Sequence, residues 1–400
     1  MKATVSPTST GAPRSGRPAA VPQPFDFTSL NRAVFGAGSL ARLGEFAREL
    51  GGTRALLVTD PGLEEAGHPQ RAEQYLRAAG LEVFVYDAVR ENPTTRHVDD
   101  GAAFALDRRT DLIVAVGGGS SMDAAKGVNF LLTNGGSMSD YKGFGRATKP
   151  MLPSIGVPTT AGTGSEAQSY ALITDEATHQ KMACGDKKAA FRVAVLDPEL
   201  TVSQPRTVTT MTGIDAVAHA IESYVCTKRN PVSQAFALSA WKYLDANFET
   251  VLREPTDLDG RAGMQVGSHF AGAAIEHAML GICHSCANPL TAHYGITHGT
   301  AIGILLPHVI RFNAHTVEHL YAELTTPTHP MNGTPASEVL ARRVEELTAL
   351  AGHPARLRDC GVSDSILSLL AVEAAEQWTA RFNPRPVMEA DLHHVYQAAW

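Results

Sequence analysis

The first half of the chain alternates short apolar runs with longer segments of helical character. The apolar runs lie at 55–60, 81–87, 111–120 and 193–200 and are bounded by Gly, Pro or Asp. Unbroken apolar runs of this length are typical of parallel strands, because such strands are covered on both faces. The alternation therefore predicts an α/β domain with a Rossmann-like parallel sheet over residues 25–205.

Beyond about residue 205 the pattern changes to long helical segments. Helices are expected at 212–225, 231–252, 262–284, 335–352 and near 388–399, with breaks at Pro231, Pro255 and Pro289. The sequence therefore predicts an all-α domain over residues 206–400. The first 24 residues are rich in Pro, Ser, Ala and Gly and are expected to form a disordered tail, with a transit peptide as the less favoured alternative.

Composition and charge narrow the class of protein. The chain is 44% hydrophobic and 19% charged, with a net charge of -7, so it offers no general basic character for nucleic acid. No apolar run approaches the length of a membrane span. The five cysteines are odd in number and show no disulfide-framework spacing. Reduced thiols and a cytoplasmic location are expected, without a nucleic-acid or membrane partner.

Four residues of the second half are candidate metal ligands. Asp215 and His219 are four residues apart in a predicted helix, which places both side chains on one face. His284 and His298 follow within one short segment. Either pair alone is commonly a surface or core feature. Together, one carboxylate and three imidazoles predict a site for a divalent transition metal with a position left for a substrate oxygen.

A glycine-rich turn, GGGSSMDAAK (117–126), follows the predicted strand at 111–120 and opens a helix. Such a turn lets backbone N–H groups approach phosphate oxygens at the positive end of the helix. It matches neither GxGxxG nor a Walker sequence, and a purely structural turn is an equally good explanation of the glycines alone. A second polar turn, PTTAGTGSEAQ (158–168), is suited to phosphate or ribose and favours the functional interpretation.

Asp60 ends the predicted strand at 55–60. A carboxylate at such a position can bind a ribose 2′-hydroxyl and repel a 2′-phosphate, which favours NAD over NADP. Capping of a helix or formation of a turn is an alternative of about equal weight for an isolated Asp-Pro-Gly.

Several segments occur together in one order: FGAGSL (35–40), LLVTD (56–60), ENPT (91–94), GGGSSMDAAK, PTTAGTGSE, DAVAHAIESY, and a histidine followed by NPLTAHYGITHG. From about residue 25 to the C-terminus the chain resembles the iron-containing (group III) alcohol dehydrogenase family. Each segment alone is weak evidence, whereas their combination is specific.

The resemblance implies a dinucleotide-binding domain, a helical domain and an active site in the cleft between them, which is a dehydroquinate synthase-like architecture. It implies NAD(H) and one divalent metal, with Fe(II) favoured and Zn(II) next, held by Asp215, His219, His284 and His298. It also implies a homodimer or larger homo-oligomer. The expected cofactor-binding residues are Asp60, Asn92, Gly117, Gly118, Gly119, Ser120, Asp123, Thr159, Thr160, Thr163, Ser165 and Lys181.

One position departs from the family pattern. The family usually has a second histidine four residues after the third ligand, but this chain has Asn288 there. Asn cannot titrate, so it is expected to hydrogen-bond the substrate or the nicotinamide while the proton takes another route. His277 lies two helical turns before His284 in the predicted helix and is a candidate relay, although a structural histidine is the commoner case.

The expected activity is reversible hydride transfer between NAD(H) and a small, polar or functionalised aldehyde and its primary alcohol. Alternatives are a hydroxyacid–oxoacid transhydrogenase, a phosphonoacetaldehyde-type reductase, a dehydroquinate synthase-like lyase and a non-catalytic binding protein. Arg146, Lys187 and Lys188 are the nearest basic candidates for an acidic substrate, and a solvated role is favoured for each. Ligation of the metal by Cys283 or Cys286 is less favoured, because neither is needed to complete the shell.

Overall fold

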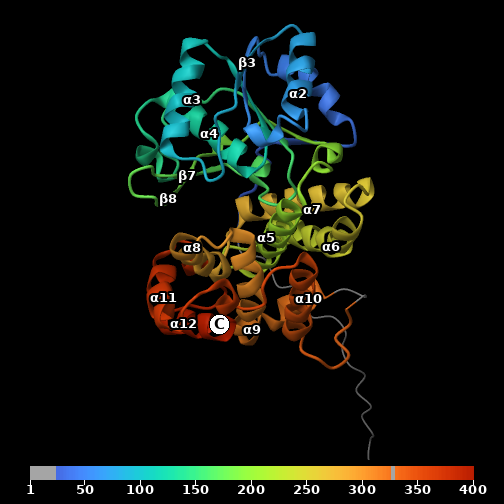
Figure 1. Cartoon of the computed structure of the whole chain (residues 1–400), viewed down its shortest axis with the longest axis vertical. Helices are drawn as coiled ribbons and strands as arrows, with labels where there is room; N and C mark the ends of the chain where they lie inside the picture. The colour runs from blue at the N-terminus through green and yellow to red at the C-terminus, as the bar shows by residue number, and fades with distance from the viewer. Residues whose placement is uncertain (1–23, 326–328) are drawn as a thin grey trace, which may run out of the picture.

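The computed structural model describes residues 24–325 and 329–400, so the expected tail over 1–24 lies almost wholly outside the described residues. Figure 1 shows an α/β part, in blue and green, stacked above a helical part, in yellow to red. The predicted combination of a parallel sheet with a helical C-terminal part is confirmed. None of the helices in the described ranges combines the length and apolar character needed to cross a lipid bilayer.

The main sheet has six strands, and all of its paired strands are parallel. Its spatial order is β1 (Arg32–Phe35), β9 (Val193–Leu196), β6 (Ser154–Pro158), β4 (Leu112–Gly117), β2 (Arg54–Val58) and β3 (Glu82–Tyr86). The four strands that the apolar runs predict are all present. β1 and β6 were not predicted; β1 is an edge strand with mostly exposed residues, so no buried run marks it.

Helices cover both faces of this sheet, which explains why its inner strands are continuously apolar. On one face Leu57 and Val114 pack in a buried cluster with Phe46 of α1 (Leu43–Glu49) and Leu76 of α2 (His68–Ala78). On the other face the alternate strand residues pack in a second cluster with α3 and α4. These helices span Thr95–Asp107 and Gly119–Asn134.

The order of the strands defines where a ligand is expected. From β2 the sheet grows first to β3 on one side and then through β4, β6 and β9 on the other. In open parallel sheets, ligands bind outside the carboxyl ends of the strands at such a switch point. The segments that follow β2 and β4 contain Asp60 and the glycine-rich turn, so the fold brings these two predicted features to one place.

A second, three-stranded sheet was not predicted. It comprises β5 (Gly143–Phe144), β8 (Lys181–Gly185) and β7 (Tyr170–Thr174), in that order. Short 3-10 helices also connect the larger elements: η1 (Ser39–Arg42), η2 (Pro61–Leu63), η3 (Met138–Tyr141), η4 (Ser165–Ala167), η5 (Lys187–Ala189), η6 (Pro198–Thr201), η7 (Leu357–Cys360), η8 (Asp364–Ile366) and η9 (Ala380–Phe382).

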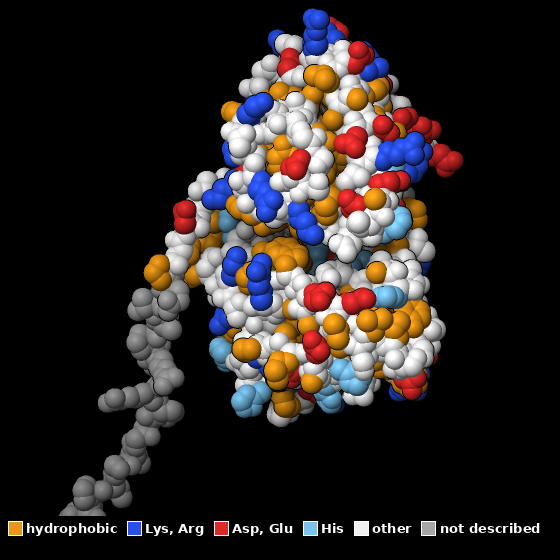
Figure 2. Space-filling view, turned by 90° about the vertical axis from the view of Figure 1, so that its left-hand side faces the viewer, with side chains coloured by type: hydrophobic (Ala, Val, Ile, Leu, Met, Phe, Trp, Pro, Cys, Tyr) orange, Lys and Arg blue, Asp and Glu red, His pale blue; other side chains and the backbone are white. Residues whose placement is uncertain are grey.

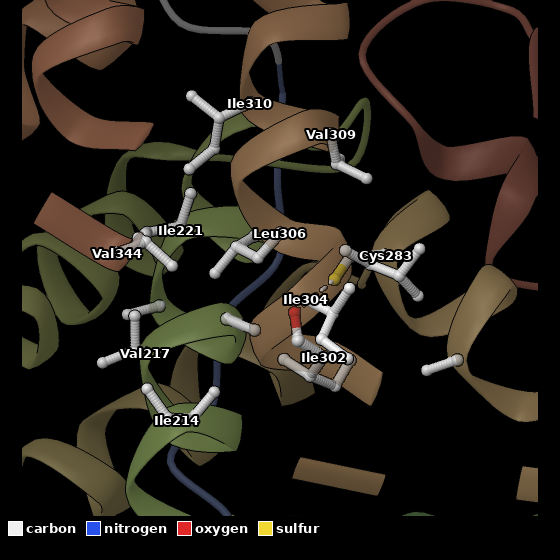
Figure 3. Packing of buried hydrophobic residues seen from close by; sticks show 14 of the residues in the cluster. Ile214, Val217, Ile221, Cys283, Ile302, Ile304, Leu306, Val309, Ile310 and Val344 are labelled. Atoms are coloured by element: carbon white, nitrogen blue, oxygen red, sulfur yellow. Dashed lines mark hydrogen bonds between the residues drawn. The ribbon is translucent and has the colours of Figure 1, made fainter. Parts of the chain in front are cut away.

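The C-terminal part is helical throughout. Its helices are α5 (Arg206–Val225), α6 (Pro231–Arg253), α7 (Leu258–His277), α8 (Ile282–Tyr294), α9 (His298–Leu324), α10 (Ala336–Ala351), α11 (Leu367–Glu376) and α12 (Glu389–Ala399). Figure 3 shows Ile214 and Ile221 of α5 packed beside Leu306 and Ile310 of α9. This apolar contact fixes the two helices that contribute most of the predicted metal ligands.

Two helix predictions are wrong in detail. The segment 262–284 is not one helix: α7 ends at His277 and α8 begins at Ile282, and Ala278 between them has φ -136° and ψ -125°. Pro289 does not separate helices but lies inside α8. The long helix α9 was not predicted, although it contains the apolar run after His298.

Candidate active site

Three helices carry the four predicted metal ligands. Asp215 and His219 are one turn apart on α5, His284 lies in the first turn of α8, and His298 is the first residue of α9. Residues 215, 219 and 284 are buried, whereas the side chain of His298 is 35% exposed. One side of the cluster is therefore open towards solvent.

One oxygen atom of Asp215 lies at the centre of the cluster. Its Oδ1 is 3.3 Å from Nε2 of His219, 3.3 Å from Nε2 of His284 and 3.5 Å from Nε2 of His298. A tetrahedral ion with ligands at about 2.1 Å holds its ligand atoms about 3.4 Å apart. Ligand atoms of Asp215, His284 and His298 all lie within 4.8 Å of one another, and His219 joins them through the same Asp215 oxygen. The donor set and its spacing fit a divalent metal ion.

The buried ligands shift one another's pKa values. Burial opposes ionisation of Asp215, but the imidazoles of His219, His284 and His298 outweigh it and hold the pKa of this carboxyl well below its usual range. Burial also disfavours a charged His284, yet its hydrogen bonds to Asp215 and Glu222 prevail and raise its pKa to about 9. The ring of His219 stacks on that of His284 with centroids 4.9 Å apart. The carboxyl group of Asp215 is thus favoured in its negatively charged form beside the three imidazoles.

Glu222, which was not among the predicted site residues, contacts one of the predicted metal ligands. Its Oε2 accepts a hydrogen bond from Nδ1 of His284 over 2.5 Å, and its Oε1 accepts one from the backbone N–H of Cys283 over 2.8 Å. Because an ionised carboxylate only accepts hydrogen bonds, Nδ1 of His284 carries the proton and Nε2 is left to face the cluster. The signal was available, since Glu222 lies seven residues after Asp215 on the same helical face.

The nearby cysteines take no part in this cluster. Sγ of Cys283 points to the carbonyl oxygen of Ile302, 3.7 Å away. Burial raises the pKa of Cys283 well above its usual value and raises that of Cys286 to about 12. A thiol with a raised pKa stays protonated and is a poor metal ligand. The geometry therefore favours the four predicted ligands over thiolate ligation.

The two predicted polar turns face each other at the carboxyl ends of β4 and β6. A Cβ placed on Gly118 would lie 3.2 Å from the side chain of Thr160, and one on Gly119 would lie 2.8 Å from that of Thr163. The N–H of Thr159 donates to the carbonyl oxygen of Gly117 over 3.0 Å. The turn at 117–120 therefore needs glycine for this approach, and α4 begins there with its backbone N–H groups directed at the same place.

Other predicted cofactor residues are brought to this edge. Asp60 caps η2 by accepting from the N–H of Gly62 over 3.1 Å, so the alternative reading of a capping residue is also correct. Lys181 donates to Oδ1 of Asn92 over 3.2 Å, which ties β8 to the loop after β3. Asp60 thus follows β2 at the switch point, and Lys181 contacts Asn92 in the loop after β3; the roles of all three towards a cofactor stay predictions.

The described hydrogen bonds of Asp123 and Ser165 all go to protein groups. Oδ1 of Asp123 accepts from Oγ of Ser165 over 2.6 Å, and Oδ2 accepts from the N–H of Leu172 over 3.1 Å. The buried ammonium group of Lys126 donates to Oγ and to the carbonyl oxygen of Ser165. This arrangement supports the polar turn, and the direct cofactor contacts of Asp123 and Ser165 stay predictions.

The two predicted catalytic residues lie in different surroundings. Asn288 is one turn after His284 on α8, and its Nδ2 donates to Oε1 of Gln377 over 3.0 Å. The predicted helical alignment of His277 with His284 is wrong, because the chain leaves the helix after residue 277. The ring of His277 packs against Phe27, with centroids 4.6 Å apart.

Figure 2 shows the surface hollowed where the α/β and helical parts meet, with Lys and Arg side chains along the border of the hollow. The stacked rings of Tyr170 and Trp378, with centroids 5.8 Å apart, connect the two parts. Nζ of Lys188 donates hydrogen bonds to Oδ1 of Asp186 and to the carbonyl oxygen of Ala147. The side chain of Lys188 is nevertheless 42% exposed, in keeping with the predicted solvated role.

Comparisons with known proteins agree with this arrangement. Residues 31–198 match the family model of the iron-containing alcohol dehydrogenases, and residues 209–400 match its C-terminal model. The chain is 32% identical to an NAD-dependent methanol dehydrogenase of Bacillus methanolicus over 92% of this chain and 97% of that protein.

Solved structures are similar over the same length. A crystal structure of 1,3-propanediol oxidoreductase has a TM-score of 0.90 at 33% identity and covers 94% of this chain and 100% of its own. Sulfoacetaldehyde reductase from Bifidobacterium kashiwanohense in complex with NAD+ has a TM-score of 0.85 at 26% identity, over 94% of this chain and 99% of its own. With its switch-point turns and its cluster of one carboxylate and three imidazoles, the chain belongs to the iron-containing alcohol dehydrogenase family.

Proposed function

We propose that this protein is an NAD(H)-dependent oxidoreductase that interconverts a small polar aldehyde and its primary alcohol at a divalent metal centre. The observation that carries the proposal is the position of Asp215 Oδ1, 3.3–3.5 Å from the Nε2 atoms of His219, His284 and His298. A bound metal ion would supply Lewis acidity there, and a bound nicotinamide would supply the hydride carrier.

The residues of the chain have distinct parts in this chemistry. Asp215 and the three histidines would hold the ion, with Fe(II) favoured and Zn(II) next. The turns that contain Gly118, Gly119 and Thr160 would receive the pyrophosphate at the N-terminus of α4. Asp60, at the end of β2, would bind the adenosine ribose and reject a 2′-phosphate. The partly exposed His298 marks the side from which the substrate oxygen would enter.

Asn288 would position the substrate rather than transfer a proton. Its Nδ2 is held by Gln377, which leaves its Oδ1 to accept a hydrogen bond from a hydroxyl group. It lies one helical turn from the ligand His284. This favours a substrate with a polar group near the reacting carbon, such as the diol that the name of one related structure indicates.

The experiment that tests the proposal follows NADH absorbance with short aldehydes. Protein stripped of metal with a chelator should lose activity, and Fe(II) or Zn(II) should restore it. The variant His284→Ala should lose both metal and activity. Undiminished turnover by the metal-free protein would contradict the proposal. A reaction without net change in NADH would instead favour a lyase, and one that needs no added NAD would favour a transhydrogenase.

A second candidate substrate class is an aldehyde with an acidic group. Lys187 and Arg381 make no ion pair in the described part of the chain. The charge of Lys187 acts on His277, and that of Arg381 acts on Tyr170, at the junction of the two parts. A related structure is a sulfoacetaldehyde reductase. In the NADH assay, a KM for sulfoacetaldehyde well below that for propanal would favour this candidate. Arg381→Ala should then raise the KM for sulfoacetaldehyde.

A further inference from the structure

Glu222 lies behind the predicted metal ligands rather than among them. Its side chain is 4% exposed, and it follows Asp215 by two helical turns on α5. Both of its oxygen atoms are used: Oε2 accepts from Nδ1 of His284 over 2.5 Å, and Oε1 accepts from the N–H of Cys283 over 2.8 Å. One carboxylate therefore fixes both the ring of a ligand and the backbone of the helix that carries it.

The start of α8 is shaped to admit this carboxylate. A Cβ on Gly281, the N-cap residue, would lie 2.9 Å from Oε1 of Glu222. Only glycine leaves the carboxylate free to approach the first turn of the helix. The free N–H groups of a helix N-terminus favour a negative charge there. The position of Glu222 thus depends both on α5, which carries it, and on the start of α8, which leaves space for its carboxylate.

Within the described part of the chain, no Lys or Arg lines the small cavity that Glu222 borders. The volume of this cavity is about 10 Å³, and its lining consists of Ile221, Glu222, Val225, Gly281, Leu306, Val309, Ile310, Asn313, Tyr321, Asn383 and Pro384. A buried carboxylate is costly unless a nearby positive charge balances it. The described hydrogen-bond partners of Glu222 are the ring of His284 and the N–H of Cys283, so the balancing charge is expected on the side of His284. Together with Asp215, Glu222 supplies two negative charges, which match one divalent ion.

We propose that Glu222 is a positioning residue of the metal centre. It holds the proton on Nδ1 of His284, so that Nε2 faces the ion, and it supplies the second negative charge that neutralises a divalent cation. Carboxylates that support a ligand in this way typically contribute about 10–100-fold to metal affinity. This inference rests on the proposed metal-dependent function, and its test does not require turnover.

The test measures the dissociation constant of Zn(II), with metal-stripped protein and a competing chromophoric chelator. Glu222→Gln should weaken binding by about 10–100-fold. Glu222→Asp keeps the charge and should recover part of the loss. The matched control is Glu323→Gln: Glu323 accepts a hydrogen bond from Tyr224 of the same helix over 2.6 Å but touches no ligand. Its affinity for Zn(II) should stay at the wild-type value.

A second readout separates positioning from general destabilisation. The visible absorption bands of the Co(II)-loaded protein should shift in Glu222→Gln, because His284 loses its anchor, and stay unchanged in Glu323→Gln. Wild-type affinity and spectrum in Glu222→Gln would overturn the inference, as would equal losses in Glu222→Gln and Glu323→Gln. If Glu222→Gln does not fold, wild-type affinity in Glu222→Asp with an unshifted spectrum overturns it. If the wild-type protein binds metal but shows no NAD-linked turnover, the proposed function is contradicted. The comparison of metal binding between Glu222→Gln and Glu323→Gln still tests the inference in that case.

Discussion

Ser121 donates a hydrogen bond from Oγ to Oδ2 of Asp60 over 3.0 Å. The bond joins the end of β2 to the first turn of α4 across the switch point of the sheet. A Cβ on Gly117 would lie 3.2 Å from the same carboxylate oxygen, so Asp60 is also in close contact with the glycine-rich turn. A residue predicted to select the cofactor is thereby fixed beside the turn predicted to bind its phosphates.

This relationship predicts how Asp60 controls cofactor choice. We expect Asp60→Ala to lower the KM for NADPH by about tenfold or more, roughly 1.4 kcal/mol, because the repulsion of a 2′-phosphate is removed. Ser121→Ala is the control: it removes the hydrogen bond but keeps the carboxylate, so the preference for NADH should persist. The measurement is kcat/KM for both cofactors. An unchanged ratio of kcat/KM in Asp60→Ala would assign Asp60 to capping of η2 alone.

Because the two polar turns approach closely, adding one methyl group at Gly119 should weaken the binding of NADH. Gly119→Ala places a Cβ 2.8 Å from Cγ2 of Thr163, so we expect the turn to shift and the KM for NADH to rise by about tenfold, or ~1.4 kcal/mol. Thr163→Ser removes that Cγ2 atom and keeps Oγ1. The double variant should recover part of the affinity. Failure of Gly119→Ala to change the KM for NADH, in a folded protein, would place the cofactor elsewhere.

The parts of the fold that the sequence predicted are those with a strong local signal. β2 and β4 are buried on both faces, so their apolar runs are unbroken, and Asp215 and His219 share a helical face. The break after His277 is weakly marked in the sequence, because Ala278, Met279 and Leu280 are good helix formers and only Gly281 disfavours a continuous helix. Only the backbone angles of Ala278 reveal it.

The missing parts of the site depend on tertiary contacts. The sequence places Glu222 on the same helical face as Asp215, but its partners Cys283 and His284 lie 61 and 62 residues away, so its contact with them could not be predicted. Asp123 is in a motif that suggests a cofactor contact, but its carboxylate turns inward to Ser165. Residue type and spacing predict which groups can bind a ligand. They do not predict which of these groups the fold uses for its own hydrogen bonds.

The pKa of His277 predicts how stability depends on pH. Burial, and the nearby charge of Lys187, lower this pKa from 6.5. Below pH 6.5 the unfolded chain binds a proton at this residue that the folded chain does not, so stability falls as the pH decreases. We expect the drop in Tm between pH 7.5 and pH 5.5 to be about 1–3 °C smaller in His277→Gln than in the wild type. An identical drop would contradict the lowered pKa.

The same variant tests His277 as a proton relay. Because burial and the charge of Lys187 lower its pKa from 6.5 in the free protein, any inflection that it causes in the pH profile of kcat/KM also lies below 6.5. The packing of its ring against Phe27 is compatible with a structural role. We expect His277→Gln to keep the shape of the pH profile. Loss of an inflection below pH 6.5 would instead support the relay.

Asn288 predicts which substrates the enzyme prefers. If its amide accepts a hydrogen bond from a substrate hydroxyl, Asn288→Ala should raise the KM for 1,3-propanediol by about fivefold, or ~1 kcal/mol, and leave that for 1-propanol unchanged. Gln377→Ala frees the amide of Asn288 and should give a smaller change in the same direction, because it removes only the bond that orients Asn288. Asn288→His adds a titratable group one turn from His284 and should introduce a new inflection in the pH profile of kcat. Equal changes in KM for the diol and for 1-propanol would show that Asn288 contacts the cofactor or only supports α8.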